Sequence, residues 1–222
     1  MDVQACEASN NSPTWGVMDV LRWKSWPERL GGGRGYIQQW KDAWVRHNRT
    51  HIREVALRHG FPAEVLAGVC WIEAGGDPVL IDRVAFEVRS FDWSGPDWMD
   101  RHMTVTHPPA RTSFGAVSMQ LRTAAQTLGM NPATTTQDDL RTLARCLEHD
   151  VFNIDLVGRH LRQLIDLDGM QMHRPALSVP AIRVLGARYN RGASLTLKQI
   201  ATNTSYGDFI VRNLRRFSTL VQ

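Results

Sequence analysis

The chain has 222 residues, of which 43% are hydrophobic and 22% charged, a balance that excludes wholesale disorder and a fibrous protein. This length fits one generous domain or a small helical extension on a core domain, and it excludes two large independent domains. The net charge of +4 and the pI near 9.3 favour an acidic polymer or surface as partner, either nucleic acid or cell wall. A moderately charged solvated surface explains the same excess equally well.

The three cysteines, Cys6, Cys70 and Cys146, are widely spaced and form no CxxC pair. This pattern predicts neither a disulfide framework nor a zinc site, so reduced thiols are expected and a Cys70–Cys146 bridge stays open. The polar start, residues 1–13, lacks the pattern of a signal peptide, and no apolar run reaches the length of a membrane span. We therefore expect an excised domain, or a protein that leaves the cell through a secretion apparatus or by phage lysis.

The first 47 residues predict a helical extension rich in tryptophan. Tyr36, Trp40 and Trp44 fall at i, i+4 and i+8, one stripe of a helix. This stripe favours an aromatic core seam, with a sugar-stacking platform as the alternative. The segment 31–35, Gly-Gly-Gly-Arg-Gly, lacks the Lys-Ser/Thr of a phosphate loop and is interpreted as a hinge.

The helix after Pro62 carries the main candidate for chemistry. Leu66, Val69, Cys70 and Glu73 share one face at helical spacing, and the helix is expected to end at Ala74-Gly75-Gly76. Apolar neighbours and the negative end of the helix dipole both disfavour the charged form of Glu73. A carboxyl that stays protonated near neutral pH can act as the general acid of a glycosidase, a logic that is usually illustrated with lysozyme.

The rest of the chain predicts a mainly helical fold with one small β element. Alternation at Val84, Phe86 and Val88 predicts a hairpin or small sheet within residues 79–91, and the region 92–111 reads as a loop. Helical periodicity then returns. The predicted helices are 119–128, 140–147 after a Thr136 cap, 154–165, 178–189 and 206–220.

Four segments, in order, resemble the motifs of lytic transglycosylases and goose-type lysozymes. The run from Leu66 to Pro78 is similar to the catalytic helix of that family, and Ser113–Leu121 to the second motif. Asn153–Leu156 with His160 is similar to the third motif, and Ala187–Gly192 to the fourth. Three features depart from the family pattern: Ala74 replaces a Ser, His160 replaces a Tyr, and the second motif is shorter or diverged around residues 116–118.

The resemblance implies a lysozyme-like α+β domain and a set of site residues. Glu73 would be the catalytic acid, and Tyr189 would orient its carboxyl through the phenol hydroxyl. Gln120 and Asn190 would bind sugar hydroxyl or acetamido groups, while Ser113 and Met119 would shape the groove wall. Packing alone would explain Met119 equally well, and a core role is an alternative for Tyr189.

A hydrolase of this kind also needs a second carboxylate at a separation characteristic of its mechanism. The Phe86-Glu87 step resembles an element of certain phage muramidases, which makes Glu87 the leading candidate. A surface ion pair with Arg83 or Arg89 would explain Glu87 as well, and Asp92, Asp97 and Asp100 are rivals. Without a second carboxylate, a transglycosylase mechanism becomes preferable, in which the 6-hydroxyl of the sugar closes an anhydro ring.

The overall prediction is an N-terminal extension at 1–47 and a lysozyme-like catalytic domain at 48–222. The domain would act as a muramidase on the β-1,4 bond between N-acetylmuramic acid and N-acetylglucosamine, in the periplasm or on the cell wall. It could serve as a phage lysin or a bacteriolytic effector, with an immunity protein as a partner in the second case. No metal, organic cofactor, nucleic acid or membrane span is expected.

Two alternatives from other classes stay open. One is an inactive peptidoglycan-binding module whose Trp-rich extension holds glycan. The other is a helical nucleic-acid binder, which rests only on the pI and on Arg212, Arg215 and Arg216 near the end of the chain.

Overall fold

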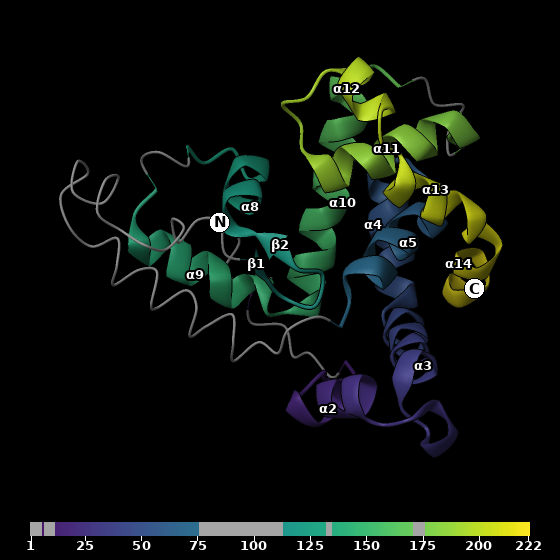
Figure 1. Ribbon diagram of the computed structural model, residues 1–222. Helices are drawn as coiled ribbons and strands as arrows, with labels where there is room; N and C mark the ends of the chain where they lie inside the picture. The colour runs from purple at the N-terminus through teal and green to yellow at the C-terminus, as the bar shows by residue number, and fades with distance from the viewer. Residues whose placement is uncertain (1–5, 7–11, 76–112, 132–134, 171–175) are drawn as a thin grey trace. The chain divides into compact units, whose positions relative to one another are not determined.

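The computed structural model describes residue 6 and residues 12–75, 113–131, 135–170 and 176–222 (Figure 1). The chain is mainly helical with one small two-stranded antiparallel sheet, which confirms the predicted fold class. The sheet joins β1 (Ser113–Phe114) to β2 (Met119–Gln120), with Ser113 opposite Gln120. The sheet predicted within residues 79–91 lies outside the described residues.

The chain divides into two compact units, each assembled from two stretches. The first unit comprises Met1–Trp40 and Gly75–Asn153, and the second comprises Lys41–Ala74 and Ile154–Gln222. This division does not follow the predicted boundary between residues 47 and 48. The reason lies in α3 (Gly33–His47), because Trp44 and Val45 near its end are buried core residues of the second unit, 1% and 0% exposed.

The second unit is built around α5 (Ala63–Glu73), whose residues from Val65 to Trp71 are all buried. It packs against α4 (Arg49–His59) and α14 (Leu214–Val221), which lie beside it in Figure 1 although α14 ends the chain. Gly68 permits the approach of α14, because a Cβ there would meet the Phe217 ring at 3.0 Å. A mostly apolar helix with small residues can be enclosed on every side in this way.

The other helices of the second unit are α10 (Asp150–Leu167, which begins in the first unit), α11 (Val179–Arg191), α12 (Leu197–Ala201) and α13 (Ser205–Arg212). The buried pair Arg188–Asp168 at 2.6 Å fixes the end of α11. Ser178 caps α11 by accepting the Ala181 amide, as its sequence position predicts. The predicted helix 206–220 is instead broken at Asn213, between α13 and α14.

The first unit contains α2 (Val17–Ser25), the 3-10 turn η1 (Glu28–Leu30), most of α3, the sheet, α8 (Leu121–Thr127) and α9 (Gln137–Leu147). The predicted helix start at Met119 is wrong, because residues 119–120 pair with β1 and α8 begins at Leu121. The Thr136 cap of α9 is confirmed, since its hydroxyl accepts the Asp139 amide at 3.2 Å. The predicted hinge lies between η1 and α3, although Gly33 and Gly35 already belong to the helix.

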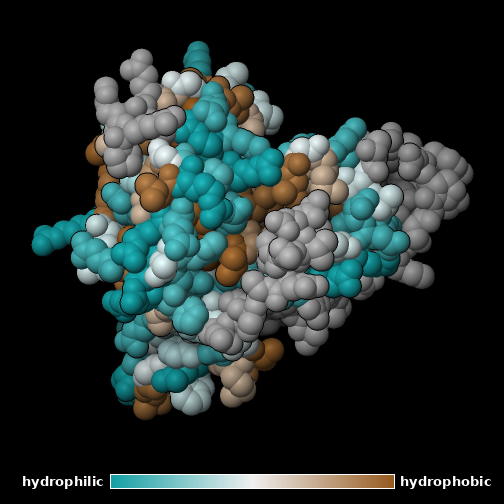
Figure 2. Space-filling view, turned by 180° about the vertical axis from the view of Figure 1, so that it is seen from behind, coloured by the Kyte–Doolittle hydropathy of each residue, from teal (hydrophilic) through white to brown (hydrophobic). Residues whose placement is uncertain are grey.

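The described surface is mixed in character, and the face in Figure 2 shows separate hydrophobic spots within a largely hydrophilic surface. Among the described residues the most exposed large hydrophobics are Leu57, 78% exposed, and Met18, 71% exposed. Single exposed side chains of this kind are normal in folded proteins. Within the described residues, no helix is long and apolar enough to cross a membrane.

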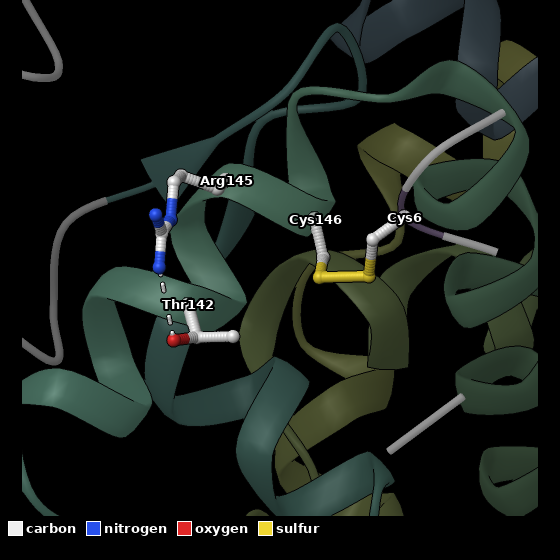
Figure 3. Close-up of a disulfide and its surroundings, with 4 residues drawn as sticks. All are labelled: Cys6, Thr142, Arg145 and Cys146. Carbon is white, nitrogen blue, oxygen red and sulfur yellow. Dashed lines mark hydrogen bonds between the residues drawn. A yellow bond between two sulfur atoms is a disulfide. The ribbon is translucent and has the colours of Figure 1, made fainter. Parts of the chain in front are cut away.

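A disulfide joins Cys6 to Cys146 in the first unit, with Cα atoms 4.7 Å apart (Figure 3). The prediction of reduced thiols is therefore wrong for these two cysteines, and the alternative bridge from Cys146 to Cys70 is wrong as well. Cys70, buried in α5, takes no part in a disulfide. The pairing depends on which chain segments meet in space, and the linear spacing of cysteines carries no information about that.

Candidate active site

Glu73 is the last residue of α5, where the chain leaves the helix. Ala74 is extended with φ −62° and ψ 138°, and Gly75 has φ +73°, a conformation that favours glycine. The predicted helix end at Ala74-Gly75 is thereby confirmed, while Gly76 lies outside the described residues. The buried helix brings the Glu73 carboxyl into the interior of the second unit, where the side chain is half-buried.

The phenol of Tyr206 is the side chain that donates a hydrogen bond to the Glu73 carboxyl among the described residues. The Tyr206 hydroxyl donates to Glu73 Oε1 at 2.7 Å across 133 positions of sequence. Burial raises the pKa of Glu73 above its usual value, and this effect outweighs the Tyr206 hydrogen bond and the nearby Lys41 charge, which both lower it. A carboxyl in this environment holds its proton to a higher pH than a solvated glutamate does.

Tyr189, whose hydroxyl was predicted to orient the Glu73 carboxyl, lies next to Tyr206, which donates the described hydrogen bond. Its ring lies beside Tyr206, with centroids 6.0 Å apart, and beside the His160 ring, which it meets edge-on at 5.9 Å. Burial and the Glu73 charge raise the pKa of Tyr189 well above its usual value. Tyr189 therefore belongs to the surroundings of Glu73, but the described donor to the carboxyl is Tyr206.

Lys41 is the cation of the site. Its side chain is only 9% exposed, and Nζ donates to the Ile72 carbonyl at 2.6 Å, one residue before Glu73. The ammonium also lies over the Trp71 ring, 5.1 Å from the centroid. Burial lowers the pKa of Lys41 to about 8, and the Glu73 charge opposes this shift.

An open pocket of about 500 Å³ adjoins these residues within the second unit. Asn190, predicted to bind sugar, lies on its wall and is exposed. Trp71 and Phe209 supply an aromatic wall, with stacked rings 5.6 Å apart. The lining residues are Lys41, Trp71, Ile72, Asn190, Ser205, Tyr206 and Phe209.

Asp42 holds the aromatic wall in place. Its Oδ1 accepts the Trp71 indole N–H at 2.8 Å and the Arg216 guanidinium at 2.8 Å. Arg216 in turn lies over the Trp71 ring, 4.8 Å from the centroid. The Trp71 ring is thus fixed by a hydrogen bond at its edge and by cations, so the pocket wall is preorganised.

The remaining predicted residues lie outside the described part of the second unit. Ser113, Met119 and Gln120 belong to the first unit, where Met119 is a core residue at 3% exposure and Gln120 is exposed. Glu87 and its rivals Asp92, Asp97 and Asp100 lie outside the described residues.

Asn153, the first residue of the third predicted motif, contacts the second predicted motif in the first unit. Asn153 Oδ1 accepts the Val117 amide at 2.9 Å, and a Cβ on Gly115 would meet the Leu147 carbonyl at 2.1 Å. This contact gives Asn153 and Gly115 a role in the local packing of the turn between β1 and β2.

Sequence reasoning missed Lys41, Tyr206, Trp71 and Phe209. Lys41 stands inside the helix that was predicted as an extension, and Tyr206 opens a short helix with no motif around it. The sequence places Lys41 directly after Trp40 of the aromatic stripe, but only the structure shows that this lysine is buried, which is rare for a lysine.

Within the described residues, no group of three His, Cys, Asp or Glu side chains is arranged to hold a metal ion. Comparisons of the chain with protein-family models, with curated proteins and with solved structures found no match.

Proposed function

We propose that this chain is a peptidoglycan muramidase that cleaves the β-1,4 bond between N-acetylmuramic acid and N-acetylglucosamine, with Glu73 as the general acid. The observation that carries the proposal is the half-buried Glu73 carboxyl at the end of α5, with a raised pKa and the Tyr206 hydroxyl on Oε1. Glycoside cleavage needs such a protonated carboxyl to protonate the leaving oxygen.

The proposed reaction begins with transfer of the Glu73 proton to the glycosidic oxygen while the bond to the anomeric carbon breaks. The Glu73 carboxylate then accepts a proton from the group that attacks this carbon. Water as the attacking group makes the enzyme a hydrolase, and the 6-hydroxyl of the same sugar makes it a lytic transglycosylase. A positioned water needs a second carboxylate, for which Glu87 stays the proposed residue.

The pocket beside Tyr206 supports a carbohydrate substrate. Phe209, half-buried and stacked on the buried Trp71, offers an apolar surface to a sugar ring, and the exposed Asn190 and Ser205 offer polar groups to its substituents. Substrate binding by Ser113, Met119 and Gln120 stays part of the proposal on the resemblance alone.

The proposal is tested by the loss of turbidity of purified cell wall with the wild-type chain and with Glu73→Gln. The substitution keeps the shape of the side chain and removes the transferable proton, so lysis should fall by at least about a hundredfold. Glu64→Gln, in the first turn of the same helix, is the matched control and should lyse the wall like the wild type. Equal lysis by the Glu73 variant would refute the assignment.

Mass spectrometry of the released fragments separates the two mechanisms, because hydrated and anhydro ends differ by one water. An inactive peptidoglycan-binding module is the second candidate, favoured by the open pocket. It predicts retention on insoluble wall without either kind of new end.

The proposed site of action is the periplasm or the cell wall, after delivery by a secretion apparatus or by phage lysis. The Cys6–Cys146 disulfide supports this, because disulfides persist in oxidising compartments and are rare in the reducing cytosol. An immunity protein is the expected partner if the chain is a bacteriolytic effector.

A further inference from the structure

The described residues use only part of the hydrogen-bonding capacity of the Lys41 ammonium. The structure describes one acceptor for it, the Ile72 carbonyl at 2.6 Å, whereas an ammonium carries three N–H donors. Only 9% of the Lys41 residue is exposed, and a charge that is partly buried is costly unless it is paired. Lys41 therefore lies in the pocket wall with N–H donors that have no acceptor among the described residues and can bind a ligand.

Two carboxylates of the site already accept hydrogen bonds from other groups. Asp42 accepts the Trp71 indole and the Arg216 guanidinium, and Glu73 accepts the Tyr206 hydroxyl. When Glu73 carries the proton that the proposed mechanism requires, it no longer offsets the charge of Lys41. Of the described residues that line the pocket, Lys41 alone is charged, so the field inside the pocket favours an anion.

N-acetylmuramic acid differs from N-acetylglucosamine by a lactyl ether that bears a carboxyl group. In an intact wall this carboxyl is linked to a peptide that has carboxylates of its own. Both sources present the same chemistry to the pocket, an anionic oxygen pair next to a sugar ring that can lie against the half-buried Phe209.

We propose that the pocket beside Glu73 recognises the muramyl side of the substrate by its carboxylate, which pairs with the ammonium of Lys41. The inference rests on the proposed function and names the anionic group that the site selects. Lys41 is then a specificity residue, which lets the site distinguish the two alternating sugars of the glycan.

The experiment uses the full chain with ¹³C in the lysine Cε positions, titrated at pH 6, where Lys41 is protonated. The sequence has three lysines, Lys24, Lys41 and Lys198, so the spectrum is assignable by substitution. The probes are N-acetylmuramic acid, muramyl dipeptide, whose lactyl carboxyl is amidated, and the neutral N-acetylglucosamine.

We expect N-acetylmuramic acid or muramyl dipeptide to shift the Lys41 signal and to bind about tenfold more tightly than N-acetylglucosamine, as suits a charge-assisted hydrogen bond. Stronger binding of the first places the lactyl carboxylate at Lys41, and stronger binding of the second places the peptide carboxylate there. If neither acid moves the Lys41 signal, or if the neutral sugar binds as tightly as both, the inference is overturned.

Substitutions give an independent measure. Lys41→Met keeps the apolar stem against Trp71 and should remove the preference for the acid, whereas Lys41→Arg should retain most of it. Lys198→Met, on the exposed face of α12, makes the same change in net charge and should bind like the wild type. A Lys41→Met protein that keeps the preference contradicts the inference, and one that fails to fold leaves the wild-type titration to decide.

The probes contain no bond between two sugars, so their binding does not depend on catalysis. A Lys41 signal that responds in a chain without lytic activity would keep this site and reject the muramidase proposal. Lytic activity without a shift of the Lys41 signal would keep the muramidase proposal and reject this site.

Discussion

The hydrogen bond from Tyr206 to Glu73 affects both the orientation of the proposed catalytic carboxyl and its pKa. The phenol stabilises the carboxylate form and so lowers the pKa of Glu73, against the larger effect of burial. The Glu73 charge also acts on Lys41 and on Tyr189, from two further positions in the fold. Tyr206 is therefore a positioning residue whose loss has two separable consequences.

Tyr206→Phe should reduce the lysis rate roughly tenfold, because the carboxyl loses its orientation. It should also raise the pKa of Glu73, so the decline in activity on the alkaline side moves to higher pH. The measurement is the pH dependence of wall lysis for both proteins. Tyr36→Phe, which removes the hydroxyl that donates to Asp19 in the first unit, is the control and should leave the profile in place. A lowered rate with an unmoved profile would contradict the positioning role.

The raised pKa of Glu73 also predicts a cost in stability. The folded chain binds this proton more tightly than the unfolded chain, so the free energy of unfolding should decrease as the pH rises from the usual glutamate pKa of 4.5 through the raised value. Glu73→Gln removes this titration.

The melting temperature of Glu73→Gln should therefore exceed that of the wild type at pH 7, and the difference should shrink towards pH 4. Calorimetry at several pH values measures this, with Glu64→Gln as the reference for a glutamate of the same helix. If the wild type is more stable than Glu73→Gln at pH 7, burial of the Glu73 carboxylate does not destabilise the folded chain, and the prediction is contradicted.

At the scale of elements, the close contact between α11 and α13 sets the position of Tyr206. A Cβ on Gly207 would meet the Arg183 carbonyl at 1.9 Å, and a Cβ on Gly186 would lie 2.6 Å from the Gly207 Cα. Arg183 also pairs with Asp208 across the same contact at 2.5 Å. Two glycines and one ion pair thus bring the first turn of α13, including Tyr206, against α11.

Gly207→Ala should force the two helices apart, lower the free energy of unfolding by about 3 kcal/mol and weaken lysis. Gly35→Ala is a matched control in α3, because an added Cβ there meets nothing within 4 Å. It should be neutral or slightly stabilising, since alanine favours helix over glycine. Chemical denaturation measures both, and an unchanged Gly207→Ala protein would exclude this contact as a determinant of the site.

At the scale of the molecule, the disulfide connects residues 140 positions apart within the first unit. A cross-link over so long a loop restricts the unfolded chain, so reduction should lower the free energy of unfolding by about 2–5 kcal/mol. Under denaturing conditions, one thiol per oxidised chain should react, that of Cys70, and three after reduction.

The double variant Cys6→Ser, Cys146→Ser is the control for this effect, because its stability should be the same with and without reductant. Three reactive thiols in the oxidised, denatured wild type would show that the bridge does not form in the protein.

Much of the secondary structure could be predicted because its signals are local. The Thr136 cap and the glycine stop after Glu73 act within one helical turn, and the structure has them where they were predicted. The start at Met119 was wrong because strand pairing with Ser113–Phe114 overrides the local helical pattern. The break at Asn213 was missed because the apolar period continues through it.

The sequence by itself determined the mainly helical class and drew attention to Glu73, because periodicity and helix ends depend on neighbouring residues. Only the tertiary structure decided which groups surround that carboxyl: Tyr206 as donor, Lys41 as cation and the aromatic pocket wall. It also decided that Cys6 pairs with Cys146. These contacts join segments far apart in the chain, and the packing of helices that creates them leaves no pattern in any one segment.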